Sequence, residues 1–167
     1  KKTSATPIYK SVDQTESANE NFKGVSRKNE HELGAALGLN YFNSFGFQGR
    51  YAYRLMPEGF IEEVNEAFLI EGGLGMTLYG TVKGKSGVTG FHFFAAGRWD
   101  FMMDPTWTFF GTVGLGYNAT SIDTGDVKGG GLFPVVGVGA LYTIDNDWAV
   151  RGDFSYHFLG VGIAYRS

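Results

Sequence analysis

Ser155 and His157 stand two residues apart in a segment where apolar and polar side chains alternate. Such alternation predicts a strand on which both side chains point to the same side. A histidine beside a serine can carry nucleophilic catalysis, because the imidazole accepts the hydroxyl proton. No oxyanion hole can be identified from the sequence, and a polar pair inside the fold is the simpler interpretation. We therefore predict no catalytic residues and no enzyme activity.

Charged side chains that alternate with apolar ones offer a second kind of chemistry. These residues are Glu32, Arg50, Arg54, Glu71, His92, Arg98, Asp100, Arg151, Asp153, His157 and Arg166. If one interior encloses them, they must pair, because an isolated buried charge costs several kcal/mol or more. The predicted ion-pair network consists of Glu71, Arg98, Asp100, Arg151, Asp153 and Arg166. A gated pore or a catalytic constellation is the functional alternative to this structural network.

Two glycine-containing motifs resemble ligand sites only superficially. The loop Ser121–Asp126 has the look of a calcium loop but lacks the distal glutamate of an EF-hand. Gly72–Gly75 lies inside a predicted strand, whereas a phosphate-binding loop must open a helix. The chain has no cysteine, which excludes disulfides and thiolate metal sites. We predict no metal site and no cofactor.

The stretch from Phe91 to Tyr117 shows which elements position these residues. Both of its arms alternate with a period of two around Asp104-Pro105-Thr106, so it predicts a β-hairpin. A three-residue turn places Phe101 opposite Phe109 and Arg98 opposite Thr112, so that paired residues share a face. A two-residue turn would pair apolar with polar residues, and we reject it.

The same alternation recurs along the chain. The further predicted strands are Glu32–Phe42, Phe47–Leu55, Phe68–Tyr79, Leu132–Thr143, Trp148–Phe158 and Val161–Ser167. With the hairpin this makes eight strands joined in chain order. Leu159-Gly160 is the predicted turn between the last two strands, which would pair Asp153 with Arg166. The segment 56–67 predicts a short turn or a one-turn helix.

The two faces of these strands indicate the environment. One face is aliphatic and aromatic, while the other holds Gly, Thr, Ala and isolated charges, a set that suits a crowded interior. A membrane β-barrel has this arrangement, with lipid outside and a polar lumen. The 26 glycines are roughly double the usual frequency of about 7%. The net charge of −3 offers no basic patch for nucleic acid, and no apolar run predicts a membrane-spanning helix.

Aromatic residues and connection lengths predict the orientation. Tight turns at Asp104 and Asp145 alternate with longer connections at 80–90 and 118–130, as periplasmic turns and outer loops do. An aromatic girdle is predicted at the periplasmic rim. It consists of Trp99, Trp107, Trp148, Tyr53, Tyr142 and Tyr165. We expect outer-membrane lipid around the barrel.

The segment from Asp147 to Tyr156, followed by Val161–Arg166, resembles the small OmpA/OmpX-like outer-membrane barrels. The resemblance covers about residues 32–167 and implies an all-β fold, an eight-stranded antiparallel up-and-down transmembrane β-barrel. It implies the outer membrane of a Gram-negative bacterium. Members of that family usually end on an aromatic residue, whereas this sequence ends on Ser167.

For such a barrel we predict a structural or protein-interaction role, as a scaffold or anchor, rather than that of a large-conductance porin. Eight strands enclose an interior that side chains just fill. One alternative is a lipid-modifying hydrolase similar to PagL, which would use Ser155 and His157. Another is a soluble lipocalin-like barrel, which would need an apolar interior.

Residues 1–31 differ from the barrel in composition. They are rich in charge, have no sustained period, and predict a periplasmic extension outside the barrel. Two short apolar islands within them contain Pro7, Ile8, Tyr9 and Phe22. Such islands can anchor a segment that orders on binding. We expect them to bind a protein partner or a neighbouring subunit, the alternative being that the extension plugs the periplasmic mouth.

Overall fold

The computed structural model describes residues 29–40, 44–57, 59–61, 64–79, 88–120 and 130–167. Within them lie eight strands, and none of the described segments is a helix long and apolar enough to cross a membrane. The strands are β1 His31–Asn40, β2 Ser44–Met56, β3 Glu66–Tyr79, β4 Val88–Met102, β5 Trp107–Thr120, β6 Gly130–Thr143, β7 Trp148–Ser155 and β8 Phe158–Arg166. The predicted extension up to residue 28, with its apolar islands, lies outside the described residues.

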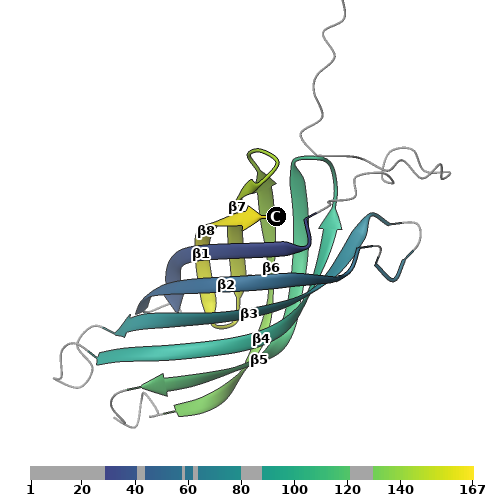
Figure 1. Cartoon of the computed structure of the whole chain (residues 1–167). Coiled ribbons are helices and arrows are strands. Elements are labelled where there is room, and N and C mark those ends of the chain that lie inside the picture. Colours follow the sequence, from purple (N-terminus) through teal and green to yellow (C-terminus); the bar gives the residue numbers. More distant parts are fainter. Residues whose placement is uncertain (1–28, 41–43, 58, 62–63, 80–87, 121–129) are drawn as a thin grey trace, which may run out of the picture.

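The strands form a closed antiparallel barrel in chain order, with β8 pairing back onto β1 (Figure 1). The register predicted for the central hairpin is confirmed: Phe101 pairs with Phe109, and Arg98 with Thr112. In both tight turns an aspartate carboxylate accepts two backbone N–H bonds. Asp104 caps the β4–β5 turn and Asp145 the β6–β7 turn. We call the barrel end that carries these turns the turn rim, and the opposite end the loop rim.

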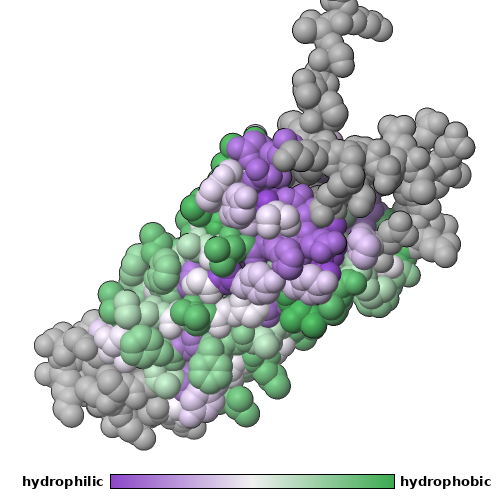
Figure 2. Space-filling view, viewed as in Figure 1, coloured by the Kyte–Doolittle hydropathy of each residue, from purple (hydrophilic) through white to green (hydrophobic). Residues whose placement is uncertain are grey.

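Alternation places apolar side chains outside and polar ones inside. In β2 the outward Tyr51 and Tyr53 are exposed, while the intervening Ala52 is buried. Figure 2 shows apolar residues over the strand wall, with hydrophilic residues gathered near the barrel end that holds the C-terminus. This is the reverse of a soluble barrel, whose apolar side chains fill the interior.

Glycines make room for the large rings that point inward. A Cβ added at Gly116 would lie 2.2 Å from the ring of Phe133, and one at Gly139 would lie 2.2 Å from the ring of Phe110. Both rings come from the neighbouring strand. The high glycine content thus reflects a bore that is too narrow for side chains at every inward position.

The turn between β7 and β8 was predicted wrongly. The β7–β8 turn is Tyr156-His157 rather than Leu159-Gly160, so Asp153 pairs with Gly160 and not with Arg166. Ser155 fixes this turn, because its Oγ accepts the Phe158 N–H at 3.1 Å and donates to the Phe158 carbonyl at 2.9 Å. Within the predicted strand Trp148–Phe158, alternation would place Phe158 on the same outward face as Phe154, but Phe158 is buried in the lumen.

The connection between β2 and β3 is a turn, one of the two alternatives predicted for residues 56–67. Its described residues form no helix. The Val64 N–H donates to the Ile61 carbonyl at 3.0 Å, which is the contact of a simple turn. β3 begins at Glu66, two residues earlier than expected, and β2 carries a register shift between Arg54 and Met56.

Strand lengths are unequal around the barrel. β7 and β8 have 8 and 9 residues, whereas β3 to β6 have 14 or 15. The β6–β7 ladder accordingly covers Gly137–Thr143 only. Pro134 lies in the part of β6 beyond this ladder, where a residue without an N–H is tolerated.

Candidate functional site in the barrel lumen

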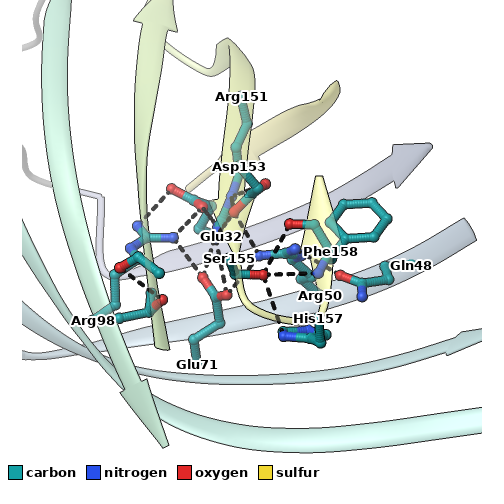
Figure 3. Close-up of polar contacts among 12 residues, drawn as sticks. Glu32, Gln48, Arg50, Glu71, Arg98, Arg151, Asp153, Ser155, His157 and Phe158 are labelled. Atoms are coloured by element: carbon teal, nitrogen blue, oxygen red, sulfur yellow. Dashed lines mark hydrogen bonds and ion pairs between the residues drawn. The ribbon is translucent and has the colours of Figure 1, made fainter. Parts of the chain in front are cut away.

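Seven charged side chains meet in the middle of the lumen, and alternation alone turns each of them inward. They are Glu32 from β1, Arg50 from β2, Glu71 from β3, Arg98 and Asp100 from β4, and Arg151 and Asp153 from β7. Each is at most 7% exposed. Figure 3 labels six of them, all except Asp100, and shows these side chains converging from opposite walls of the barrel.

Glu71 is the hub of this network. Its carboxylate accepts hydrogen bonds from Arg50 at 3.1 Å, from Arg98 at 2.8 Å and from Arg151 at 2.6 Å. Glu32 forms a bidentate pair with Arg98 at 2.6 and 3.0 Å and also accepts from Arg151 at 3.3 Å. Bidentate, charge-assisted contacts of this kind are the strongest hydrogen bonds in proteins.

Two aspartates complete the network, and each binds the arginine two residues before it in the same strand. Asp100 binds Arg98 with bonds of 2.8 and 3.1 Å, and Asp153 binds Arg151 with bonds of 3.0 to 3.2 Å. Asp153 also accepts from Arg50 at 2.9 Å across the bore. Four carboxylates therefore contact three guanidinium groups, and these ion pairs offset part of the cost of burying the charges.

Aromatic rings line the guanidinium groups. The Arg151 guanidinium lies 4.5 Å from the Phe110 ring centroid, and that of Arg98 lies 5.4 Å from the same ring. Arg50 lies 5.5 Å from the rings of both Phe94 and Phe158. These cation–π contacts fill the space beside the network.

A directional chain leads from the network toward the loop rim. Arg50 donates to the Gln48 side-chain oxygen at 2.6 Å, so the Gln48 amide nitrogen faces His92 at 2.8 Å. The Nε2 atom of His92 must then be the acceptor. Beyond it, the His157 ring packs 5.0 Å from Phe133 and 5.8 Å from Phe94.

The Ser155–His157 pair exists but is enclosed. Ser155 Oγ lies 3.2 Å from His157 Nδ1 and also makes both bonds of the turn with Phe158. Both side chains are buried inside the barrel. The Ser155 hydroxyl therefore stabilises the turn by hydrogen bonds. Neither side chain is accessible from outside the barrel wall.

Five of the six residues predicted for the ion-pair network lie in it: Glu71, Arg98, Asp100, Arg151 and Asp153. The sixth, Arg166, donates to Thr143 Oγ1 at 3.1 Å near the turn rim and pairs in register with Glu32. Glu32 and Arg50 were expected in the lumen but not as members of the network. Their inward positions were the available signal, whereas their partners across the bore were not visible in the sequence.

The six residues of the predicted girdle lie outward near the turn rim. The rings of Trp107 and Tyr142 are 5.0 Å apart, and those of Trp148 and Tyr165 are 5.1 Å apart. Trp99 pairs in register with Phe68, and Tyr53 with His31, at the same end of the barrel. Among the described residues, no group of three or more histidine and acidic side chains is placed to hold a metal ion.

Comparisons with known proteins agree on the fold. No family model and no curated protein matches the chain. A designed transmembrane β-barrel matches with a TM-score of 0.58 and 18% identity, over 86% of this chain and all of that chain. The outer membrane enzyme PagL matches with a TM-score of 0.54 and 12% identity, over 81% and 97% of the two chains. Ail, the attachment invasion locus protein of Yersinia pestis, matches with a TM-score of 0.51 and 15% identity, over 82% and 96%.

Proposed function

We propose that this chain is an outer-membrane β-barrel protein of a Gram-negative bacterium with a structural or protein-interaction role, and that it is not a large-conductance porin. The apolar outer wall, the aromatic girdle at the turn rim and the fold shared with outer-membrane barrels support the location. The tight turns at the turn rim support placing that rim in the periplasm.

The filled lumen carries the functional part of this proposal. Glu71 and the three arginines that bind it span the bore, and the Phe110 and Phe94 rings occupy the space beside them. An ion crossing the barrel would have to separate these pairs in a medium of low dielectric constant. A passive, persistent pore is therefore not expected.

Planar-bilayer recording tests this role. At neutral pH the wild-type protein should give no long-lived open state. The double variant Glu71→Ala/Arg151→Ala removes one charge of each sign from the hub and widens the bore, so it should conduct measurably. Current through this variant shows that the protein inserts into the bilayer under the conditions of the recording. Stable large channels from the wild-type protein would contradict the proposal.

The contacts of Ser155 favour this role over a hydrolase. A serine nucleophile must be reachable by its substrate and activated by a base. Ser155 Oγ instead makes both turn bonds with Phe158 inside the barrel. We therefore assign no catalytic residue to the chain.

We also propose a protein partner for the N-terminal extension. Its support is the pair of apolar islands around Tyr9 and Phe22 in an otherwise charged segment. Deletion of residues 1–27 should leave the barrel folded and abolish co-purification of the partner in mild detergent. A matched variant, Tyr9→Ala/Phe22→Ala in the full chain, should have the same effect. Retention of the same co-purifying proteins by both variants would refute this role.

A further inference from the structure

The connection between β2 and β3 differs from the other two connections at the turn rim. Those two are tight turns, each capped by an aspartate. The described residues of this connection are Pro57, Gly59–Ile61 and Val64–Asn65, which we call the strap. Three of its side chains are apolar and exposed: Phe60 by 60%, Ile61 by 44% and Val64 by 39%.

Phe60 places the strap against the outer wall of the barrel. Its ring meets Phe68 edge-on, with the centroids 5.6 Å apart, and meets Trp99 in the same way at 5.7 Å. Phe68 and Trp99 are paired residues of β3 and β4 that both point outward. Backbone bonds continue this attachment, since the Met102 N–H donates to the Asn65 carbonyl at 2.9 Å.

Glu66 is the clamp that holds the strap. It lies on the outward side of β3, as do Phe68 and Ile70, yet only 2% of it is exposed. Its carboxylate accepts the Ile61 N–H at 2.5 Å and the indole N–H of Trp99. A Cβ at Gly59 would lie 2.3 Å from the Glu66 side chain, so a larger residue at this position would displace the Glu66 carboxyl group.

A carboxylate on a lipid-facing wall is costly unless it is hydrogen-bonded and covered. The strap supplies one of the donors and the cover, while Ile61, Val64 and much of the Phe60 ring stay exposed. Continuity with the girdle residue Trp99 puts Phe60 at the level where aromatic rings meet lipid headgroups.

We infer that the strap is an interfacial membrane anchor, with Phe60 and Ile61 inserted at the headgroup–acyl boundary of the leaflet on the turn-rim side. Its partner is the lipid surface itself. This inference rests on the proposal that the barrel spans a membrane. Apolar side chains at the end of an outer wall fit lipid better than they fit a ligand of the mouth, where the charged residues Arg54, Asp100 and Arg166 are among those that line a small cavity.

The natural absence of cysteine allows a direct measurement of depth. Single variants Ile61→Cys, Pro105→Cys and Leu115→Cys are labelled with an environment-sensitive fluorophore in phosphatidylcholine vesicles. Pro105 is in a tight turn at the same rim, and Leu115 is an outward residue of β5 that is 64% exposed. The label at position 61 should be quenched by nitroxide-labelled lipid and protected from an aqueous quencher, and the label at 105 should behave in the opposite way.

The label at position 115 separates the two proposals. If nitroxide lipid quenches it while the label at 61 responds to the aqueous quencher as the label at 105 does, the anchor is refuted and the membrane barrel stands. If the label at 115 is not quenched by lipid, the membrane barrel itself fails, and the anchor fails with it.

Glu66→Ala tests the clamp. Loss of the carboxylate should expose the label at 61 to the aqueous quencher and leave the label at 115 unchanged. Asp104→Ala, which removes a carboxylate from a different turn of the same rim, should change neither label. An unchanged label at 61 in Glu66→Ala would show that Glu66 does not hold the strap.

Discussion

At the scale of single residues, the lumen is organised by side chains that reach across it. Arg151 extends from β7 to Glu71 of β3, and Arg98 extends from β4 to Glu32 of β1. These strands are not neighbours, so the contacts tie together parts of the wall that no backbone ladder joins. Removing one member of such a buried network is costly, because it leaves the opposite charge unpaired.

Mutation of Asp153 can test whether its side chain is energetically coupled to Arg50 or to Arg166. It bonds Arg50 at 2.9 Å, whereas Arg166 bonds Thr143. In double-mutant cycles with Asp153→Ala and Arg50→Ala we expect a coupling energy of about 0.5–3 kcal/mol, measured by denaturant unfolding in detergent. The matched cycle with Arg166→Ala should be additive to within about 0.5 kcal/mol. Strong coupling to Arg166 with none to Arg50 would contradict the observed network.

At this scale the sequence predicted whether a side chain points into the lumen or out of it. It did not predict which charged side chains form ion pairs with one another. Period-two alternation indicated that Glu71, Arg98 and Asp153 point inward, because a strand leaves only two choices. Which of them meet depends on how far each long side chain reaches across a closed bore. The sequence holds no periodic signal for that distance.

At the scale of elements, turn chemistry decided where prediction succeeded. Asp104 and Asp145 each follow a strand and cap a turn with one carboxylate oxygen, a local pattern that the sequence displays. The β7–β8 turn uses Ser155 instead, and Gly160 was the more obvious turn residue. Moving the turn by three residues replaced the Asp153–Arg166 pairing with the Asp153–Gly160 pairing.

Ser155→Ala should therefore weaken the hairpin rather than abolish an activity. It removes the acceptor of the Phe158 N–H and the donor to the Phe158 carbonyl, both buried. We expect a loss of about 1–3 kcal/mol in unfolding free energy. Ser155→Thr keeps the hydroxyl and should retain most of the stability. If Ser155→Ala is as stable as the wild type, the hydroxyl does not hold the turn.

The strap shows why the sequence left both a turn and a one-turn helix open for residues 56–67. Ile61, Val64 and Phe68 have the spacing of one helical face, yet Phe68 belongs to β3 and Phe60 packs against it from outside. What fixes the strap is the Glu66 carboxylate with the Trp99 indole, a contact between residues 33 positions apart. Local spacing cannot report a contact of that kind.

At the scale of the whole molecule, closure of the sheet accounts for a robust barrel. Each strand is hydrogen-bonded to a neighbour on both sides. β1 pairs with β8 from Glu32 to Asn40, and this pairing closes the sheet into a barrel. The eight strands and their order followed from the sequence, because alternation repeated in every segment and hairpins connect neighbours. The unequal lengths of β7 and β8 did not, since they depend on the misplaced turn.

Closure predicts resistance to detergent denaturation. With no free sheet edge, unfolding must break many ladders and the buried network together, so the folded barrel should survive SDS at room temperature and unfold only on boiling. Gel mobility with and without heating measures this, and the two samples should migrate differently. A chain ending at residue 157 lacks β8, which leaves β1 and β7 with open edges. It should therefore migrate identically in both conditions. Identical mobility of the full chain, together with solubility in the absence of detergent, would count against a closed membrane barrel.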